Sequence, residues 1–373
     1  MTTFPKLAAA GLAGCLAAGV AHQVYATMRV RAGHRGFERH QLRCGTGNIL
    51  TYHVRRGAPG APTLVCEAGL MNSSATWLLT ADHLDPRISV LVYDRAGYRT
   101  SLRRCPEDYS LRESVDDLVE VIADGVDPTG PCVLAGYSLG GYLAHRAAAA
   151  APERVNGLVL VDPTHPRELM HSRRQREGSR GVNLTMKLGP NTVLFGGGLL
   201  IDKRGLYAFA DGSPHYNTLR IEGSAVSTWR AARREWDHSY AFLLDGGRPL
   251  DRLNVPVSVV AAESTMRDTP EQRELYEDYL ASGTGGRIVT IAGTSHLSII
   301  GGVEEAPKTT RAIEAAVAEI VETGEEDSLR GRQREDDGPG GGAGDSRDLR
   351  RVVRGVGPGP APRPELRQDT KLG

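Results

Sequence analysis

Short apolar runs alternate with amphipathic stretches along most of the chain. Apolar runs bounded by turn residues predict buried strands at 63–66, 88–93, 132–135, 154–161, 255–262 and 287–291. Apolar positions spaced three and four residues apart, or runs rich in alanine, predict helices at 111–122, 143–151, 271–280 and 306–321. Strands that alternate with helices in this way favour an α/β fold with a mostly parallel sheet covered on both faces.

Three other patterns mark the domain organisation. Residues 37–55 alternate around a turn at 45–48 and predict a β-hairpin. Residues 164–250 break the strand–helix alternation and are rich in arginine, glycine and aromatic residues, with a helical pattern at 227–243. We therefore expect an apolar N-terminal segment at residues 1–30 and a core formed by residues 35–164 and 251–322. An insertion at 165–250 separates the two parts of the core, and a tail follows at 323–373.

The tail is expected to be disordered. From about Gly324 the sequence is dominated by glycine, proline, arginine and aspartate and contains no aromatic residue. Such a segment buries too little apolar surface to offset the entropy lost on ordering.

Residues 7–28 form an apolar segment rich in alanine and glycine, behind Lys6. Several interpretations stay open: a signal peptide with a small-residue cleavage site at 24–26, a membrane anchor, a lipoprotein-type segment around Cys15, or a weakly hydrophobic helix. Basic residues after the segment favour an anchor with the folded body on the cytoplasmic side, and secretion is the alternative. These residues are Arg29, Arg31, Arg35 and Arg39.

The composition of the chain limits the kinds of partner and cofactor that can be inferred. The chain has 45 lysines and arginines against 45 aspartates and glutamates, so its net charge gives no indication of nucleic-acid binding. The five cysteines match neither a metal site nor a disulfide framework in their spacing. We expect no metal and no cofactor, and the sequence leaves the oligomeric state open.

One motif indicates chemistry. An apolar run at 132–135 leads into a G-x-S-x-G sequence, which opens an alanine-rich helix: Gly136-Tyr137-Ser138-Leu139-Gly140-Gly141. A strand, a tight turn and a helix would project the Ser138 hydroxyl above the sheet, close to a helix N-terminus that favours negative charge. The small neighbours are needed because such a turn is strained. An ordinary turn serine is the alternative interpretation.

The ordered set of motifs resembles the α/β-hydrolase fold superfamily over residues 37–321. The most similar members are small serine esterase-like hydrolases with loops such as Glu67-Ala68-Gly69 after the third strand and Tyr93-Asp94-Arg95-Ala96-Gly97 after the fourth. The resemblance implies a mostly parallel sheet of the eight-stranded type and a helical cap at the insertion. It also implies that Ser138 is a nucleophile and that His296, in a loop after the last strand, is its base.

The third member of the implied triad is less clearly placed. Most of the superfamily has an aspartate in the loop that here follows residues 255–262, but this chain has Thr265 near that position. Asp162, at the end of the preceding predicted strand, is the expected acid, as in some haloalkane dehalogenases of this fold. Glu263 is the main alternative and Asp268 a weaker one, while a structural capping role for Asp162 also stays open.

The resemblance further implies an oxyanion hole made by the backbone N–H groups of Leu139 and Leu70. Arg95, beside Asp94 in the loop after the fourth strand, is expected to form a structural ion pair rather than to touch a substrate. Aromatic residues at helical spacing in the insertion, Trp229, Trp236 and Tyr240, are expected to pack the insertion onto the core or to line a pocket.

Two classes of function follow. The first is a serine hydrolase that cleaves a small ester, amide or related acyl substrate through an acyl-enzyme. The second is a ligand-binding or weakly active protein on the same fold, because a fold does not fix a function. A serine-dependent lyase or perhydrolase ranks third. The serine at the elbow argues against dehalogenase and epoxide hydrolase chemistry, which uses a carboxylate nucleophile.

Overall fold

The computed structural model describes residues 3–31, 33–197 and 207–336. The chain divides into two units, residues 1–327 and 328–373. The larger part of the expected tail, residues 337–373, lies outside the described residues.

The core is one sheet of eight strands in the order β1-β2-β4-β3-β5-β6-β7-β8. β1 and β2 form the predicted hairpin and run antiparallel to their neighbours, and the other strands are parallel. The predicted fold class is thereby confirmed. The strands are β1 Glu38–Arg43, β2 Ile49–Arg55, β3 Thr63–Glu67, β4 Ser89–Asp94, β5 Cys132–Tyr137, β6 Gly157–Val161, β7 Val257–Ala262 and β8 Ile288–Ile291.

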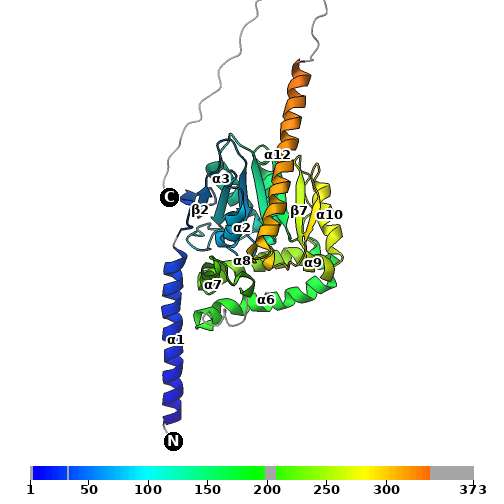
Figure 1. Ribbon diagram of the computed structural model, residues 1–373. Helices are drawn as coiled ribbons and strands as arrows, with labels where there is room; N and C mark the ends of the chain where they lie inside the picture. The colour runs from blue at the N-terminus through cyan, green and yellow to red at the C-terminus, as the bar shows by residue number, and fades with distance from the viewer. Residues whose placement is uncertain (1–2, 32, 198–206, 337–373) are drawn as a thin grey trace, which may run out of the picture. The chain divides into compact units, whose positions relative to one another are not determined.

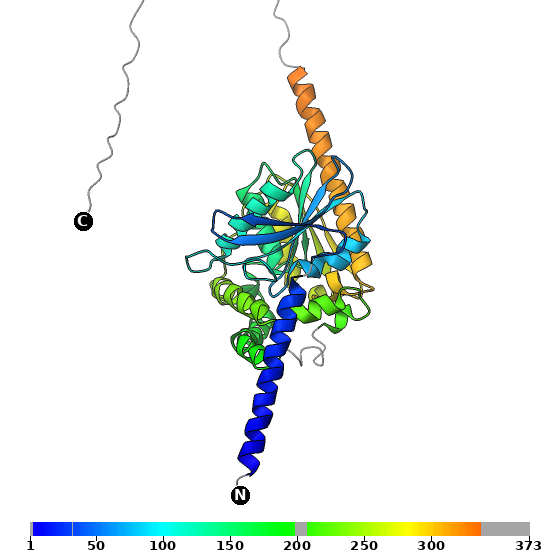
Figure 2. The same ribbon diagram turned by 90° about the vertical axis from the view of Figure 1, so that its left-hand side faces the viewer.

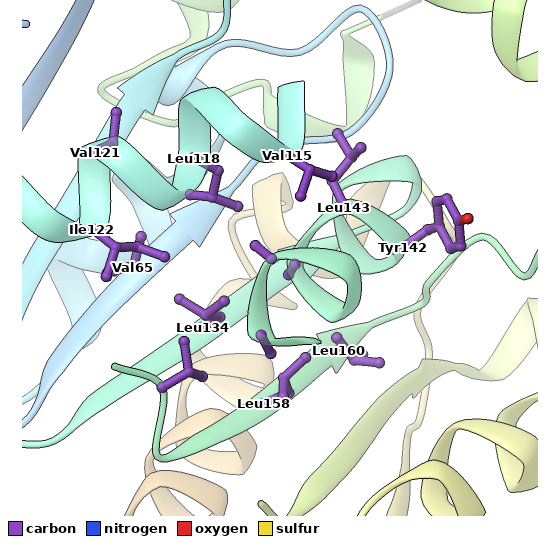
Figure 3. Packing of buried hydrophobic residues seen from close by; sticks show 14 of the residues in the cluster. Val65, Val115, Leu118, Val121, Ile122, Leu134, Tyr142, Leu143, Leu158 and Leu160 are labelled. Atoms are coloured by element: carbon purple, nitrogen blue, oxygen red, sulfur yellow. The ribbon is translucent and has the colours of Figure 1, made fainter. Parts of the chain in front are cut away.

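Helices cover both faces of the sheet because the side chains of each central strand alternate between two apolar clusters. Leu134 and Leu158 face α3 (Leu111–Gly125), α4 (Leu139–Ala150) and α10 (Gln272–Ser282), and Figure 3 shows the packing against α3 and α4. The adjacent residues Val133 and Val159 face the other way. They pack against residues of η1 (Ser74–Trp77), α2 (Leu78–His83), α11 (Ser298–Gly301) and α12 (Ala306–Asp336).

The insertion predicted at 165–250 lies between β6 and β7 and is mainly helical. Figure 1 shows its long helices below the sheet in that view, where α6 packs along α8. Its apolar cluster contains the expected Trp229 and Trp236 and includes Leu78 and Tyr98 of the core, with Tyr240 packed against it. The described elements are α5 Glu168–His171, α6 Arg173–Leu194, η4 Ala208–Ala210, α7 Tyr216–Gly223 and α8 Val226–Leu244, and α9 (Glu263–Asp268) follows β7.

The N-terminal segment forms helix α1 (Thr3–Val30), whose end packs on the insertion (Figure 2). Ala26 and Val30 are buried against Ile221 and Ala225. The Gln23 amide donates to the Ser224 carbonyl at 2.9 Å and accepts from the Val226 N–H at 2.9 Å. Within the described residues, every helix is too short or too polar to cross a bilayer. The predicted membrane role of residues 7–28 stays a prediction.

The last helix corrects the predicted start of the tail. Helix α12 begins at Ala306 as expected but continues to Asp336, past the predicted end at residue 321. Glycine and proline dominate only after this point, whereas residues 325–336 are rich in glutamate and arginine, which have favourable helix propensities. The prediction of disorder from residue 323 was therefore wrong for residues 323–336.

Deletion of residues 325–373 is expected to leave the melting temperature unchanged. Among the residues whose burial is described, Ile320 is the last fully buried side chain of α12, and it packs over Gly157 of β6, whereas residues 322–324 are exposed. Thermal unfolding of the truncated and full-length proteins tests this. Ile320→Ala is the positive control and should lower the unfolding free energy by about 2–5 kcal/mol. A large loss of stability on truncation would show that the tail packs on the core.

Candidate active site

Ser138 occupies a strained turn between β5 and α4. Its φ is 54° and its ψ is −125°, in a region that side-chain-bearing residues seldom adopt. Glycine is required beside it because a Cβ on Gly136 would lie 2.5 Å from the Gly140 carbonyl oxygen, and one on Gly141 would lie 2.5 Å from Pro163. This turn places the Ser138 side chain on the wall of a cavity.

His296 lies in the loop between β8 and α11, as expected. Its Nε2 is 3.1 Å from Ser138 Oγ, and its Nδ1 is 2.7 Å from Asp162 Oδ2. The Tyr137 ring stacks against the imidazole at a centroid distance of 5.1 Å, and the Tyr137 hydroxyl donates to the His296 carbonyl at 2.6 Å. The ring is held from two sides, while 43 % of the side chain remains exposed.

Asp162 follows β6 with a φ of 42° and is 2 % exposed. Besides His296, three donors reach its carboxylate: Ala262 N–H at 2.9 Å, Thr265 Oγ1 at 2.7 Å and Tyr276 Oη at 2.9 Å. Burial by itself would raise the pKa of Asp162, but the hydrogen bonds and the interaction with His296 outweigh burial and lower the pKa. The carboxylate is therefore ionised at neutral pH and points its Oδ2 at the imidazole.

The alternative carboxylates lie elsewhere. Glu263 Oε2 accepts the Gly293 N–H at 2.9 Å, and Asp268 pairs with Arg267 at 2.9 Å and Arg174 at 3.4 Å. Neither is hydrogen-bonded to His296. Of the three candidate acids, the structure brings only Asp162 to the imidazole, and its catalytic role remains a prediction.

The two predicted oxyanion donors lie beside Ser138. Leu70 and Leu139 both line the cavity, and a Cβ on Gly69 would lie 3.0 Å from Ser138 Cβ. Leu139 is the first residue of α4, so its N–H has no acceptor in the preceding turn of helix. No described residue accepts a hydrogen bond from the N–H of Leu70. Both N–H groups are available for a ligand oxygen.

Arg95 forms structural ion pairs, as expected, but its partners are not its neighbour Asp94. Its fully buried guanidinium forms ion pairs with Glu67 at 2.5 Å and Glu235 of α8 at 2.7 Å, and it donates to the carbonyls of Ala68 and Gly69. Asp94 lies near Arg99 instead, at 3.3 Å. Arg95 thereby holds the loop that carries Leu70 and ties it to the insertion.

The cavity beside Ser138 and His296 has a volume of about 520 Å³. Its wall is formed by the core and by the insertion, including α6 and α8, and its mostly apolar surface is interspersed with polar side chains. Sequence reasoning missed most of these, Glu168 and Gln272 among them, because they lie in no motif. The polar lining includes Asn72, Glu168, Gln175, Ser239, Thr265 and Gln272.

The ionisation of His296 follows from its neighbours. Burial acts to lower its pKa, but the hydrogen bond and charge of Asp162, together with the charge of Glu168, raise it above 6.5. Burial raises the pKa of Glu168 to about 7, against the effects of the His165 N–H and His296. Among the described residues, no group of three or more His, Cys, Asp or Glu side chains is placed to hold a metal ion.

A family model described as "Alpha/beta hydrolase family" matches residues 58–312, more than half of the chain. The chain belongs to this family. It is 32% identical over 108 residues to "Putative carbamate hydrolase RutD" of Serratia proteamaculans and 34% identical over 116 residues to "Lipase LipV" of Mycobacterium tuberculosis. These alignments cover 29% and 31% of this chain, and only 39% and 42% of the relatives.

The fold is also similar to that of a solved structure. The Cif epoxide hydrolase from Acinetobacter nosocomialis matches 80% of this chain and 96% of its own with a TM-score of 0.59. The sequence identity is 16%, so this likeness concerns the fold alone.

The pKa of His296 is expected to lie above 6.5 and to fall in Asp162→Asn, because this change removes the charge that stabilises the imidazolium. Titration of the imidazole by NMR measures both. Glu263→Gln is the matched control and should leave the pKa unchanged, since Glu263 binds the Gly293 N–H. A fall in Glu263→Gln, with no change in Asp162→Asn, would assign the partner carboxylate to Glu263.

Proposed function

We propose that this protein is a serine hydrolase that cleaves a small acyl substrate with Ser138 as nucleophile, His296 as base and Asp162 as acid. The observation that carries the proposal is the continuous path of hydrogen bonds from Ser138 Oγ through the imidazole to Asp162 Oδ2, at 3.1 Å and 2.7 Å. The order of the three groups and their distances fit acyl transfer.

In the proposed reaction Ser138 Oγ attacks the carbonyl carbon while His296 Nε2 takes the hydroxyl proton. Asp162 holds Nδ1–H and stabilises the imidazolium. The oxyanion binds the N–H groups of Leu70 and Leu139. His296 then gives its proton to the leaving group as the bond to the acyl carbon breaks, which leaves the acyl-enzyme. In the second half, water attacks the acyl carbon while His296 takes its proton, and His296 returns a proton to Ser138 Oγ as the acyl product leaves.

The substrate is proposed to be an ester, amide or carbamate of modest size. The names of the relatives, a carbamate hydrolase and a lipase, both describe hydrolases of acyl compounds. A cavity of about 520 Å³ with a mostly apolar wall suits a small molecule. The alternative, a ligand-binding protein without turnover, would keep the cavity but leave Ser138 unreactive.

Ser138→Ala and His296→Ala are each expected to lower kcat/KM for p-nitrophenyl propionate on the order of 10⁴-fold, and the double variant should be little worse, because the two groups act as one unit. A fluorophosphonate probe should label the wild-type protein and not Ser138→Ala. Circular dichroism checks that each variant is folded. Absence of labelling in the folded wild type would favour the binding-protein alternative.

We also propose that the N-terminal segment holds the protein at a membrane, with the folded body on the cytoplasmic side. The apolar residues 7–28 and the four arginines that follow support this proposal. Exposed Val20, Val24 and Met28 on α1 add apolar surface next to these arginines. The proposal requires association with the bilayer and leaves open whether the segment spans it.

Membrane fractions of producing cells are expected to contain the full-length protein, and deletion of residues 1–28 should release it into the soluble fraction. The apolar surface is lost in this deletion, while Arg29, Arg31, Arg35 and Arg39 remain as a control for charge alone. Protease added outside sealed cells should leave the body intact. Secreted protein that begins near Thr27 would establish export.

A further inference from the structure

The cavity contains a buried hydrogen-bond acceptor that the protein does not use. Gln272 begins α10, lines the cavity beside the proposed triad and is 2 % exposed. Its Oε1 is buried and has no hydrogen-bond partner among the described residues. An unpaired buried carbonyl oxygen is unfavourable, and native structures contain few of them, so this atom calls for an explanation.

The surrounding hydrogen bonds fix which end of the amide is unpaired. The Tyr276 hydroxyl donates its only hydrogen to Asp162 Oδ1 at 2.9 Å. That hydroxyl can then only accept, and Gln272, one turn earlier on α10, acts on it as a donor would, since it works to lower the pKa of Tyr276 against the larger effect of burial. The amide NH₂ is the only donor that Gln272 has. Oε1 is therefore the end left without a partner.

A second hydrogen-bond acceptor lines the same cavity and comes from the insertion. Glu168 of α5 accepts the His165 N–H with Oε2 at 3.2 Å, and no described residue donates to its Oε1. The carboxyl lies close enough to His296 for its charge to act on the imidazole. Two elements that are about 100 residues apart thus each bring an unused acceptor to the wall beside Ser138.

We propose that Gln272 and Glu168 select acyl substrates that carry an N–H donor next to the carbonyl group, as carbamates and carboxamides do. This inference rests on the proposed function and names the substrate class of the same site. A donor on the substrate supplies the hydrogen bond that Gln272 Oε1 lacks, with Glu168 Oε1 as a second acceptor in the same wall, whereas a methylene at that position leaves Gln272 Oε1 unpaired. Buried acceptors discriminate against a ligand without the matching donor for this reason.

The test compares two substrates that differ only in this group, p-nitrophenyl N-methylcarbamate and p-nitrophenyl propionate. Each acylates Ser138 as the C–O bond breaks and p-nitrophenolate leaves, so the initial release gives the second-order acylation constant. The measured quantity is the ratio of the carbamate constant to the propionate constant. Because Gln272 also bonds to Tyr276, its replacement can disturb the triad, but such a disturbance affects both substrates and cancels in the ratio.

The ratio is expected to fall about tenfold in Gln272→Leu, the effect of one lost hydrogen bond, and to return toward the wild-type value in Gln272→Glu, which keeps an acceptor. Gln175→Leu is the matched control, because Gln175 lines the same cavity but is only half-buried, and its ratio should not change. If Gln272→Leu does not fold, Glu168→Leu provides the same measurement and should also lower the ratio.

The outcomes separate this inference from the proposed function. Wild-type protein that is labelled at Ser138 and cleaves the propionate, with a ratio unchanged in Gln272→Leu and Glu168→Leu, overturns the inference alone and indicates that water satisfies both acceptors. An equal fall of the ratio in Gln175→Leu also overturns it. Protein that is neither labelled nor active on the propionate overturns the proposed function.

Discussion

The buried carboxylate of Asp162 is the interaction on which the site depends. An anion that is 2 % exposed is tolerated only when donors surround it, and here four donors reach its two oxygens. They come from the end of β7, from α9, from α10 and from the loop after β8. The loss of one donor would leave the buried charge of Asp162 less well compensated. The carboxylate therefore constrains the positions of all four segments.

A second buried charge, that of Arg95, fixes the loop that carries Leu70. Arg95 binds Glu67 of β3 and Glu235 of α8, and its remaining donors hold the carbonyls of Ala68 and Gly69. The loop that carries the Leu70 N–H is thus fixed by the core and by the insertion together. Because Gly140 also packs against the Ala68 carbonyl, the loop and the serine turn cannot move independently.

Those parts of the fold and site that depend on local sequence could be predicted. The strand, glycine-rich turn and helix around Ser138 are contiguous, and His296 follows the last strand directly, so both positions could be inferred from short stretches of sequence. The choice among Asp162, Glu263 and Asp268 could not be made this way, because it depends on which carboxylate reaches across the ends of three strands.

Two other features also depend on contacts between distant segments, whereas the end of α12 was predicted wrongly for a different reason. An ion pair was expected for Arg95, but its partners Glu67 and Glu235 could not be named, because both lie in segments distant in the chain. Gln272 lies in no motif, and only the structure shows that its buried amide oxygen has no hydrogen-bond partner among the described residues. The end of α12 was misjudged because the composition of the whole tail concealed the helix-favouring residues 325–336.

The presence of Thr265, rather than an aspartate, after β7 is consistent with the same electrostatics. Thr265 Oγ1 and His296 Nδ1 both bond to Oδ2 of Asp162, so position 265 lies beside the atom that faces the imidazole. Two carboxylates there would repel each other, and one would have to take up a proton. A hydroxyl donor instead completes the hydrogen bonds of the acid. Glu168 shows the same constraint at longer range, since burial, with the charge of Asp162 adding to it, raises its pKa to about 7.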